Sequence, residues 1–252
     1  MTISLADRLG VGQSDLVAFA GAGGKSSLLL GLGAELAAAG SRVVLTTTTK
    51  MGAYQIPRWA TVCRTVTEVI TALEGGDPAF LVGDIDGDKI IGVAPELVDQ
   101  VSARAEVDFV LVEADGARGR SLKVPAPYEP VIPDSTTRVV VVAGIDAVGR
   151  AIVDATHRPE RVVGLLGRAL EDPVRPADVA RVLSDPDGGF WRVPVEARVT
   201  VVLTKVMPGA AAAAAAQITE LLEDTQIDRV ATIESVPNSA IDVDRSRLIS
   251  GP

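Results

Sequence analysis

The sequence predicts an α/β protein in which a mainly parallel sheet lies between two layers of helices. Three observations predict this fold class. Short runs of Val, Leu, Ile and Ala alternate with helical segments along the chain. Apolar residues make up 47% of the sequence but aromatic residues only 3%, a composition typical of parallel strands that are covered on both faces. Residues 15–47 have the pattern of strand, glycine-rich turn, helix and strand, a crossover unit that builds parallel sheets.

The elements of the first half follow from apolar periodicity and turn residues. An amphipathic helix is expected at residues 2–9, with Ile3, Leu5 and Leu9 on its buried side. A strand at 15–20 leads into a helix at 26–39, which Gly40 ends as a left-handed cap residue. The next strand, at 42–47, is expected beside the first. Residues 51–60 have the composition of a loop.

The second half continues this alternation, and we expect residues 1–252 to form one domain. An Asp-Gly pair predicts a hairpin at 84–93. The proline-punctuated residues 147–190 are expected to form a helical insertion, and the alanine-rich residues 210–222 a helix. Further helices are expected at 68–74 and 95–105, and further strands at 79–83, 107–112, 138–143, 199–203 and 229–233.

The strongest functional signal is the turn between the first strand and its helix. It contains, in order, Gly21, Ala22, Gly23, Gly24, Lys25, Ser26 and Ser27. Backbone N–H groups of such a turn converge on phosphate oxygens, and the helix N-terminus adds a favourable dipole. Lys25 is expected to neutralise the phosphates and Ser26 to coordinate Mg²⁺. Phe19 stands where the usual first glycine belongs, so we predict a variant P-loop in a three-layer, P-loop NTPase-like fold. A merely tight turn explains the glycines but not the lysine.

A second signal is the strand at 107–112, which ends in Glu113-Ala-Asp115-Gly116. An aliphatic strand that ends in carboxylates is typical of a Walker-B element, which holds Mg²⁺ beside the P-loop serine. The predicted metal site is therefore Ser26, Glu113 and Asp115, and the predicted catalytic groups are Lys25, Glu113 and Asp115. The alternative is a solvated strand end.

Two other strand ends carry candidate ligand contacts. Thr48, Thr49 and Lys50 follow the second strand, at the edge where ligands bind in such folds; local capping by threonine is the alternative. Lys205 follows the strand at 199–203, where guanine-specific proteins carry Asn-Lys-x-Asp. Met207 replaces that aspartate. The sequence thus does not support guanine specificity, and ATP is our working assumption for a base that stays unidentified.

The long segment 113–133 combines glycines, prolines and the basic residues Arg118, Arg120 and Lys123. A loop of this length is usually functional or disordered. We expect its basic residues to form an anion-binding wall opposite the P-loop, with a solvated loop as the alternative. The single histidine, His157, and the single cysteine, Cys63, are expected to be structural. One histidine and one cysteine make a dedicated zinc site improbable.

The overall charge restricts the partners. The formal net charge of −9 argues against binding to nucleic acid or to anionic membrane surfaces. Apolar runs are too short to span a bilayer, and the first residues do not have the pattern of a secretory signal. With no pair of cysteines for an internal disulfide, a cytoplasmic protein is expected.

Taken together, several segments resemble the YqeC family. They are residues 17–27, 45–51, 110–116, 122–126, 129–133 and 202–206. The resemblance covers nearly the whole chain, and it implies a P-loop NTPase-like fold. Lys25 and Ser26 then match the P-loop, Thr48 to Lys50 the threonine-lysine motif, and Glu113, Asp115 and Lys123 the acidic strand end with its loop. The family tends to have Asn-Lys-Val-Asp where this sequence has Thr204-Lys205-Val206-Met207.

Members of that family are described as accessory factors for selenium-dependent molybdenum hydroxylases. The resemblance therefore implies a nucleotide-dependent maturation factor, with a molybdopterin-type cofactor or a molybdenum hydroxylase as partner. Such a factor would hydrolyse the nucleotide or transfer a phosphoryl or nucleotidyl group. Two alternatives stay open: a non-catalytic chaperone that holds a phosphate-bearing pterin cofactor, and a small-molecule kinase.

Overall fold

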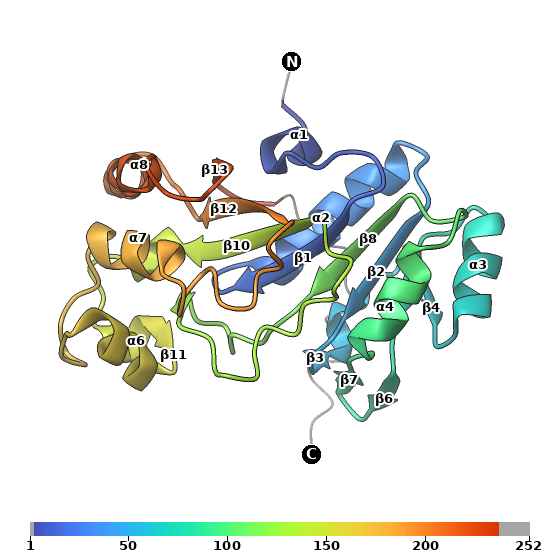
Figure 1. Ribbon diagram of the computed structural model, residues 1–252, viewed down its shortest axis with the longest axis horizontal. Coiled ribbons are helices and arrows are strands. Elements are labelled where there is room, and N and C mark those ends of the chain that lie inside the picture. The colour runs from blue at the N-terminus through green and yellow to red at the C-terminus, as the bar shows by residue number, and fades with distance from the viewer. Residues whose placement is uncertain (1–2, 237–252) are drawn as a thin grey trace.

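The computed structural model describes residues 3–236. Its centre is an eight-stranded sheet in which every neighbouring pair of strands is parallel. The order across the sheet is β13-β12-β10-β1-β8-β2-β5-β4 (Figure 1). These strands are β1 (Leu16–Gly21), β2 (Val43–Thr47), β4 (Thr61–Cys63), β5 (Ala79–Leu81), β8 (Phe109–Glu113), β10 (Arg138–Gly144), β12 (Arg198–Thr204) and β13 (Arg229–Ile233).

Helices cover both faces of the sheet because the central strands are apolar on both sides. One face carries α1 (Leu5–Leu9) and α2 (Lys25–Ala38). The opposite face carries α3 (Val66–Glu74) and α4 (Pro95–Ser102) over β2, β5 and β8. The same face carries α7 (Pro176–Ser184) and α8 (Ala210–Leu222) over β10 and β12. The prediction of a three-layer, P-loop NTPase-like α/β fold is confirmed.

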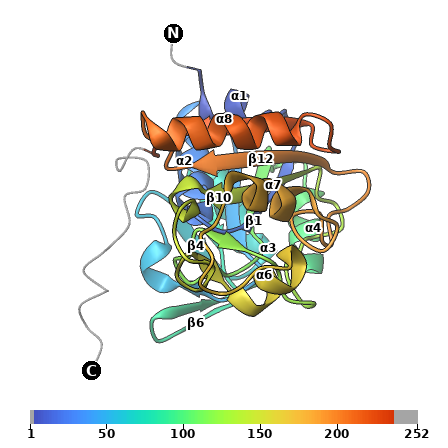
Figure 2. The ribbon, with the colours of Figure 1, turned by 90° about the vertical axis from the view of Figure 1, so that its left-hand side faces the viewer.

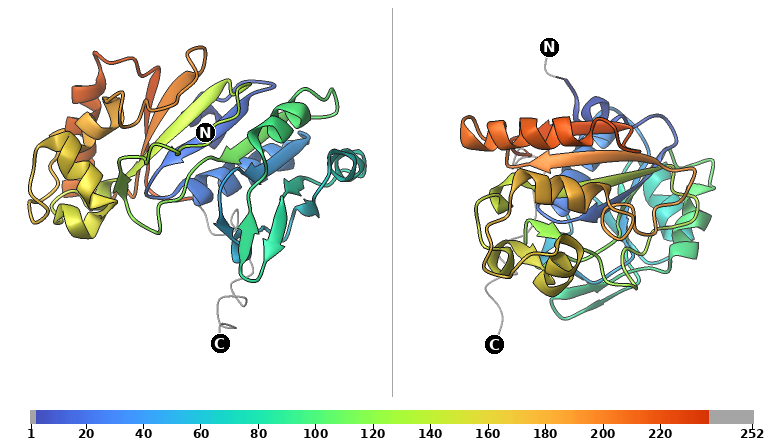
Figure 3. Two further views of the ribbon diagram at one scale, coloured as in Figure 1. Left: turned by 60° about the horizontal axis from the view of Figure 1, so that its bottom comes forward. Right: turned by 60° about the vertical axis from the view of Figure 1, so that its left-hand side comes forward.

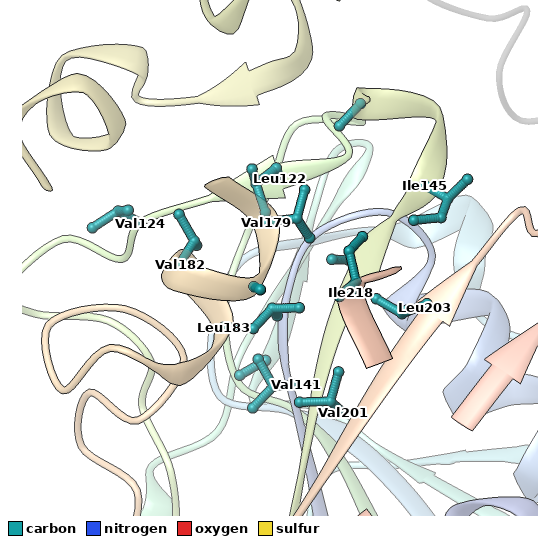
Figure 4. Close-up of a cluster of buried hydrophobic side chains, with 14 of the residues drawn as sticks. Leu122, Val124, Val141, Ile145, Val179, Val182, Leu183, Val201, Leu203 and Ile218 are labelled. Carbon is teal, nitrogen blue, oxygen red and sulfur yellow. The ribbon is translucent and has the colours of Figure 1, made fainter. Parts of the chain in front are cut away.

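The core under α7 and α8 shows how this packing arises. Leu183 of α7 and Ile218 of α8 meet Val141 of β10 and Val201 of β12 (Figure 4). Each such side chain is at most 3% exposed, and burial of one contributes roughly 1.5–3 kcal/mol. The alanine-rich helix α8 lies along β12 in Figure 2.

Two small sheets lie at the carboxyl end of the main sheet (Figure 3). One contains β3 (Met51–Gly52), β6 (Asp84–Asp86) and β7 (Lys89–Ile91). The other pairs β9 (Leu122–Lys123) with β11 (Thr156–His157). The insertion that carries β11 also contains α5 (Ile152–Ala155) and α6 (Pro159–Leu166). In Figure 1 the insertion, in yellow, and the β3-β7-β6 sheet lie on opposite sides of this end.

Several expectations are confirmed in detail. The hairpin forms between β6 and β7. Gly40 follows α2 with a φ of 82°, as a left-handed residue should, and Cys63 is free and buried. Within residues 3–236, no helix is long and apolar enough to cross a membrane.

Others are wrong. The strand β2 does not lie beside β1: the more strongly apolar β8 lies between them and pairs with both, which the order of segments along the chain does not reveal. Ile3 is 61% exposed because the first helix begins only at Leu5; Thr2 of the expected helix lies outside the described residues. The expected loop at 51–60 contains β3 and the 3₁₀ helix η1 (Ala53–Gln55), since the β6–β7 hairpin supplies a pairing partner.

Candidate functional site

The glycine-rich turn joins β1 to α2. Gly21, Gly23 and Gly24 have φ values of 94°, 92° and 135°, a region that residues with a Cβ rarely adopt. A Cβ at Gly21 or Gly23 would also collide with the backbone at the end of β10, so these two glycines let the turn lie against that strand. Gly24 is the N-cap residue of α2 and supplies no side-chain cap. The first N–H groups of this helix are therefore available to an anion.

Lys25 is the first residue of α2 and is only 4% exposed. Its Nζ donates to the carbonyl oxygen of Gly21 at 2.8 Å and lies 3.2 Å from Asp115 Oδ1. Burial alone would lower the pKa of Lys25, but the carboxylates of Asp115 and Glu113 outweigh it and raise the pKa above its ordinary value. Lys25 is therefore a firmly protonated cation beside the turn.

Glu113 ends β8, directly opposite Phe19 of β1. This register brings its carboxylate to the start of α2, where Ser26 Oγ donates a 2.6 Å hydrogen bond to Glu113 Oε2. Burial raises the pKa of Glu113, although Lys25 and the bond from Ser26 oppose the shift. Hydroxyl and carboxylate oxygens are the hard ligands that suit Mg²⁺, which usually keeps several waters. Ser26 and Glu113 thus fit a magnesium ion shared with phosphate.

Asp115 lies behind the turn instead of facing outward and is 1% exposed. Its Oδ2 accepts a hydrogen bond from the N–H of Gly21 at 3.0 Å and lies 2.9 Å from Lys123 Nζ. Its Oδ1 pairs with Lys25. Every one of these contacts is to the turn or to a lysine, so in this arrangement the carboxylate holds Lys25 and the turn in position.

From Lys123 the charges continue into the insertion. Lys123 Nζ lies 2.9 Å from Glu129 Oε2, and Arg158 donates to the same oxygen at 2.6 Å. The guanidinium of Arg158 also lies over the Tyr128 ring, 5.7 Å from its centroid. Burial would raise the pKa of Glu129, but the hydrogen bonds from Arg158 and Lys123 hold it below its usual value. We name this set the buried ionic chain: Lys25, Asp115, Lys123, Glu129 and Arg158.

The threonines after β2 have separate tasks. Thr48 Oγ1 donates to the carbonyl oxygen of Val131 at 2.6 Å and so ties the end of β2 to the 113–133 loop. Thr49 and Lys50 instead line the open space in front of the turn. The predicted ligand contact is therefore available to Thr49 and Lys50, while Thr48 supports them from behind.

On the other side of the turn, β12 ends beside it. Thr204 Oγ1 donates to the carbonyl oxygen of Gly23 at 2.5 Å. Lys205 has a left-handed φ of 59°, and its Nζ lies 2.9 Å from Asp146 Oδ2 and 3.0 Å from Ser121 Oγ. Lys205 is therefore held at the edge of the same open space.

These groups surround one cleft with a volume of about 740 Å³, a size typical of small-molecule sites. Basic side chains line it in excess over carboxylates, although acidic residues outnumber basic ones 33 to 24 in the whole chain. The basic residues are Lys25, Lys50, Lys89, Arg118, Arg120, Arg158 and Lys205, and the carboxylates are Glu113 and Glu129. The remaining lysine of the chain, Lys123, belongs to the buried ionic chain.

The cleft brings most of the predicted site residues together. Those that line it are Gly23, Gly24, Lys25, Ser26, Ser27, Thr49, Lys50, Glu113 and Lys205, with Arg118 and Arg120 of the predicted wall. Five predicted residues do not line it and support it from behind: Gly21, Ala22, Thr48, Asp115 and Lys123.

Sequence reasoning missed other residues of the lining. They include Tyr54, Gln55, Lys89, Glu129 and Arg158. The scarcity of lysine was a usable signal for Lys89, but no sequence signal pointed to the aromatic ring or the amide. His157 also lines the cleft; burial, with the nearby charges of Arg158 and Lys123, lowers its pKa, so it is neutral at pH 7.

No group of three or more His, Cys, Asp or Glu that could hold a metal occurs in the part of the chain that the structure describes. A Mg²⁺ ion at Ser26 and Glu113 would thus depend on phosphate and water for its remaining ligands.

A parallel sheet between two layers of helices, with a Gly-Lys-Ser turn after one strand and a carboxylate at the end of the next, has the arrangement of a P-loop NTPase-like fold. The sequence model of the family described as "YqeC protein" matches residues 17–160, which include the turn, Glu113 and the buried ionic chain. The chain is also 33% identical over 183 residues, 71% of each chain, to the protein named "Uncharacterized protein YqeC" of Escherichia coli strain K12. The chain belongs to the YqeC family.

Proposed function

We propose that this protein binds a nucleoside triphosphate with Mg²⁺ in the cleft and acts as a nucleotide-dependent accessory factor in the maturation of a selenium-containing molybdenum hydroxylase cofactor. One observation carries the nucleotide part. In an acidic chain, seven basic side chains line the cleft, which opens at the free N-terminus of a helix behind a Gly-Lys-Ser turn. Such an arrangement favours a ligand with several adjacent negative charges.

In this proposal the chain's own residues have distinct roles. The N–H groups at the start of α2 donate hydrogen bonds to the phosphates, and Lys25 neutralises their charge. Ser26 and Glu113 would hold Mg²⁺, which would supply neutralisation of the phosphate charge. We predicted Asp115 as a metal ligand and catalytic group. In this proposal it instead holds the Lys25 side chain in position, because both of its oxygens contact the turn or the lysines. Positioning and charge are the main means of catalysis in such sites.

Binding is tested by titrating ATP, GTP and CTP, each with Mg²⁺, into the wild type and three variants. Lys25→Ala removes a charge-assisted contact worth roughly 1.5–3 kcal/mol, so we expect affinity to fall by about 10- to 150-fold. Glu113→Gln should abolish the Mg²⁺ dependence of binding. The control Arg42→Ala also removes one positive charge, but at the amino end of β2, away from the cleft. Its affinity for the nucleotides should be unchanged. If none of the nucleotides binds the wild type, the proposal fails.

Turnover is measured separately, as phosphate release by the same proteins. We expect release that Lys25→Ala and Glu113→Gln abolish. Nucleotide binding without any turnover, together with tight binding of a pterin phosphate, would favour the chaperone alternative. For the accessory role, the genomic neighbours give a direct check: a host that lacks molybdenum hydroxylase and selenium genes would refute it and leave the small-molecule kinase.

A further inference from the structure

The cleft carries more basic side chains than the binding of one nucleotide requires. Along the carboxyl edge of the sheet the strands follow in the order β12, β10, β1, β8 and β2. The turn follows β1 and Glu113 ends β8. Lys205 follows β12 on one side, and Lys50 follows β2 on the other. The edge therefore has a β12 side and a β2 side, with the phosphate turn between them.

In the proposed function, the terminal phosphate of the nucleotide lies beside Ser26 and Glu113. The strand corresponding to β12 carries the base-reading segment in guanine-specific P-loop proteins, so we expect the nucleotide to run toward the β12 side. Lys205 stands at that place, paired with Asp146. The nucleotide thus accounts for Lys25 and Lys205 and leaves the β2 side free.

The β2 side carries basic groups without a firm partner. Within residues 3–236, the side chain of Lys50 makes no hydrogen bond or ion pair, and that of Lys89 has only a loose pair, 3.6 Å, with the exposed Asp88. Lys89 lies opposite Gly52 in the β3–β7 pair, which places it near Lys50. Unpaired cations that share a concave site attract an anion strongly.

An aromatic side chain lies on the same side. The Tyr54 ring packs so closely over Gly52 that a Cβ at Gly52 would collide with it, and Gly52 lies opposite Lys89. Lys50, Lys89 and Tyr54 all line the cleft, so an aromatic ring and two cations bound the β2 side.

We propose that the β2 side of the cleft binds a second, phosphate-bearing molecule next to the terminal phosphate of the nucleotide, with Lys50 and Lys89 as its anion ligands. The proposal rests on the proposed nucleotide binding and adds a second site to it. The cleft then holds two substrates, as transfer of a phosphoryl or nucleotidyl group requires, whereas a simple hydrolase needs only one substrate and water.

The test is a calorimetric titration of inorganic pyrophosphate into protein saturated with a non-hydrolysable ATP analogue and Mg²⁺. We expect the wild type to bind one further equivalent. The double variant Lys50→Ala/Lys89→Ala should bind pyrophosphate about tenfold more weakly or worse, a larger loss than the one in its affinity for the ATP analogue. Lys50→Arg/Lys89→Arg should restore binding. The matched control Arg42→Ala/Arg104→Ala loses the same charge at the opposite edge of the sheet and should bind normally.

The outcomes separate the two proposals. If the ATP analogue does not bind the wild type, nucleotide binding itself is refuted. If the analogue binds but pyrophosphate does not, or if the lysine double variant loses the nucleotide instead, the second site is refuted while nucleotide binding stands. Citrate in a parallel titration separates phosphate from carboxylate: citrate binding equal to that of pyrophosphate refutes a phosphate-bearing ligand.

Discussion

Replacing Lys123 with methionine should destabilise the protein strongly, and the buried ionic chain gives the size of the effect. The Lys123 side chain is 1% exposed, as is that of Asp115. Removing one partner of a buried ion pair typically costs about 3–5 kcal/mol, because a charge is left uncompensated. Here each carboxylate keeps a second cation, Lys25 for Asp115 and Arg158 for Glu129. We therefore expect the lower end, about 3 kcal/mol.

The control is the same substitution at an exposed pair. Lys89 and Asp88 have side chains that are 51% and 80% exposed, so Lys89→Met should cost less than about 1 kcal/mol. For a protein of this size, about 3 kcal/mol corresponds to a melting temperature lowered by roughly 6–12 °C. Urea unfolding and thermal unfolding, both followed by circular dichroism, measure the two variants. Equal losses for Lys123→Met and Lys89→Met would show that the buried ionic chain does not stabilise the fold.

Three further predictions concern the turn, the pH dependence and the thiol. Gly23→Ala should destabilise the protein far more than Gly40→Ala in urea unfolding, because both have a positive φ but only at Gly23 would a Cβ meet backbone; equal losses would contradict the packing argument. The raised pKa of Glu113 means that the folded protein binds its proton more tightly than the unfolded chain does, so this carboxyl lowers stability as pH rises from its unfolded pKa toward its folded pKa. Glu113→Gln should therefore be the more stable protein at pH 7, with the difference vanishing below about pH 4; a constant difference across pH would refute this. Burial raises the pKa of the Cys63 thiol, so the native protein should react slowly with a thiol reagent and quickly in urea, and equal rates would show that the thiol is accessible.

Local signals in the sequence were sufficient to predict the glycine-rich turn and the carboxylate of Glu113 beside it. The order strand, Gly-Lys-Ser, helix fixes where Lys25 and Ser26 lie relative to each other, and only the pairing of β8 with β1 is needed to bring Glu113 to Ser26. The sequence cannot supply that pairing directly, and our expectation that β2 lies beside β1 was wrong for this reason. Ser26 and Glu113 nevertheless lie close together, because β1 and β8 end at the same edge of the sheet.

The role of Asp115 shows where local reasoning ends. Glu113 and Asp115 stand two residues apart, and the sequence gives no reason to separate them. In the structure Glu113 faces the cleft, while Asp115 lies behind the turn between Lys25 and Lys123. That difference depends on Lys123, Glu129 and the distant insertion. The Tyr54 wall likewise depends on a pairing between β3 and β7 that spans a long stretch of chain.

The contrast between the acidic chain and its basic cleft also affects how fast a ligand arrives. A body with net charge −9 repels small anions over most of its surface, whereas a concave basic site concentrates the field and draws them inward. Capture of an anionic ligand should then be fast in dilute buffer and slow steeply as ionic strength rises, while its escape, governed by contacts at short range, changes little. If the proposed anion binding holds, the placement of every lysine of the chain in or against the cleft speeds the capture of the ligand as well as adding to its affinity.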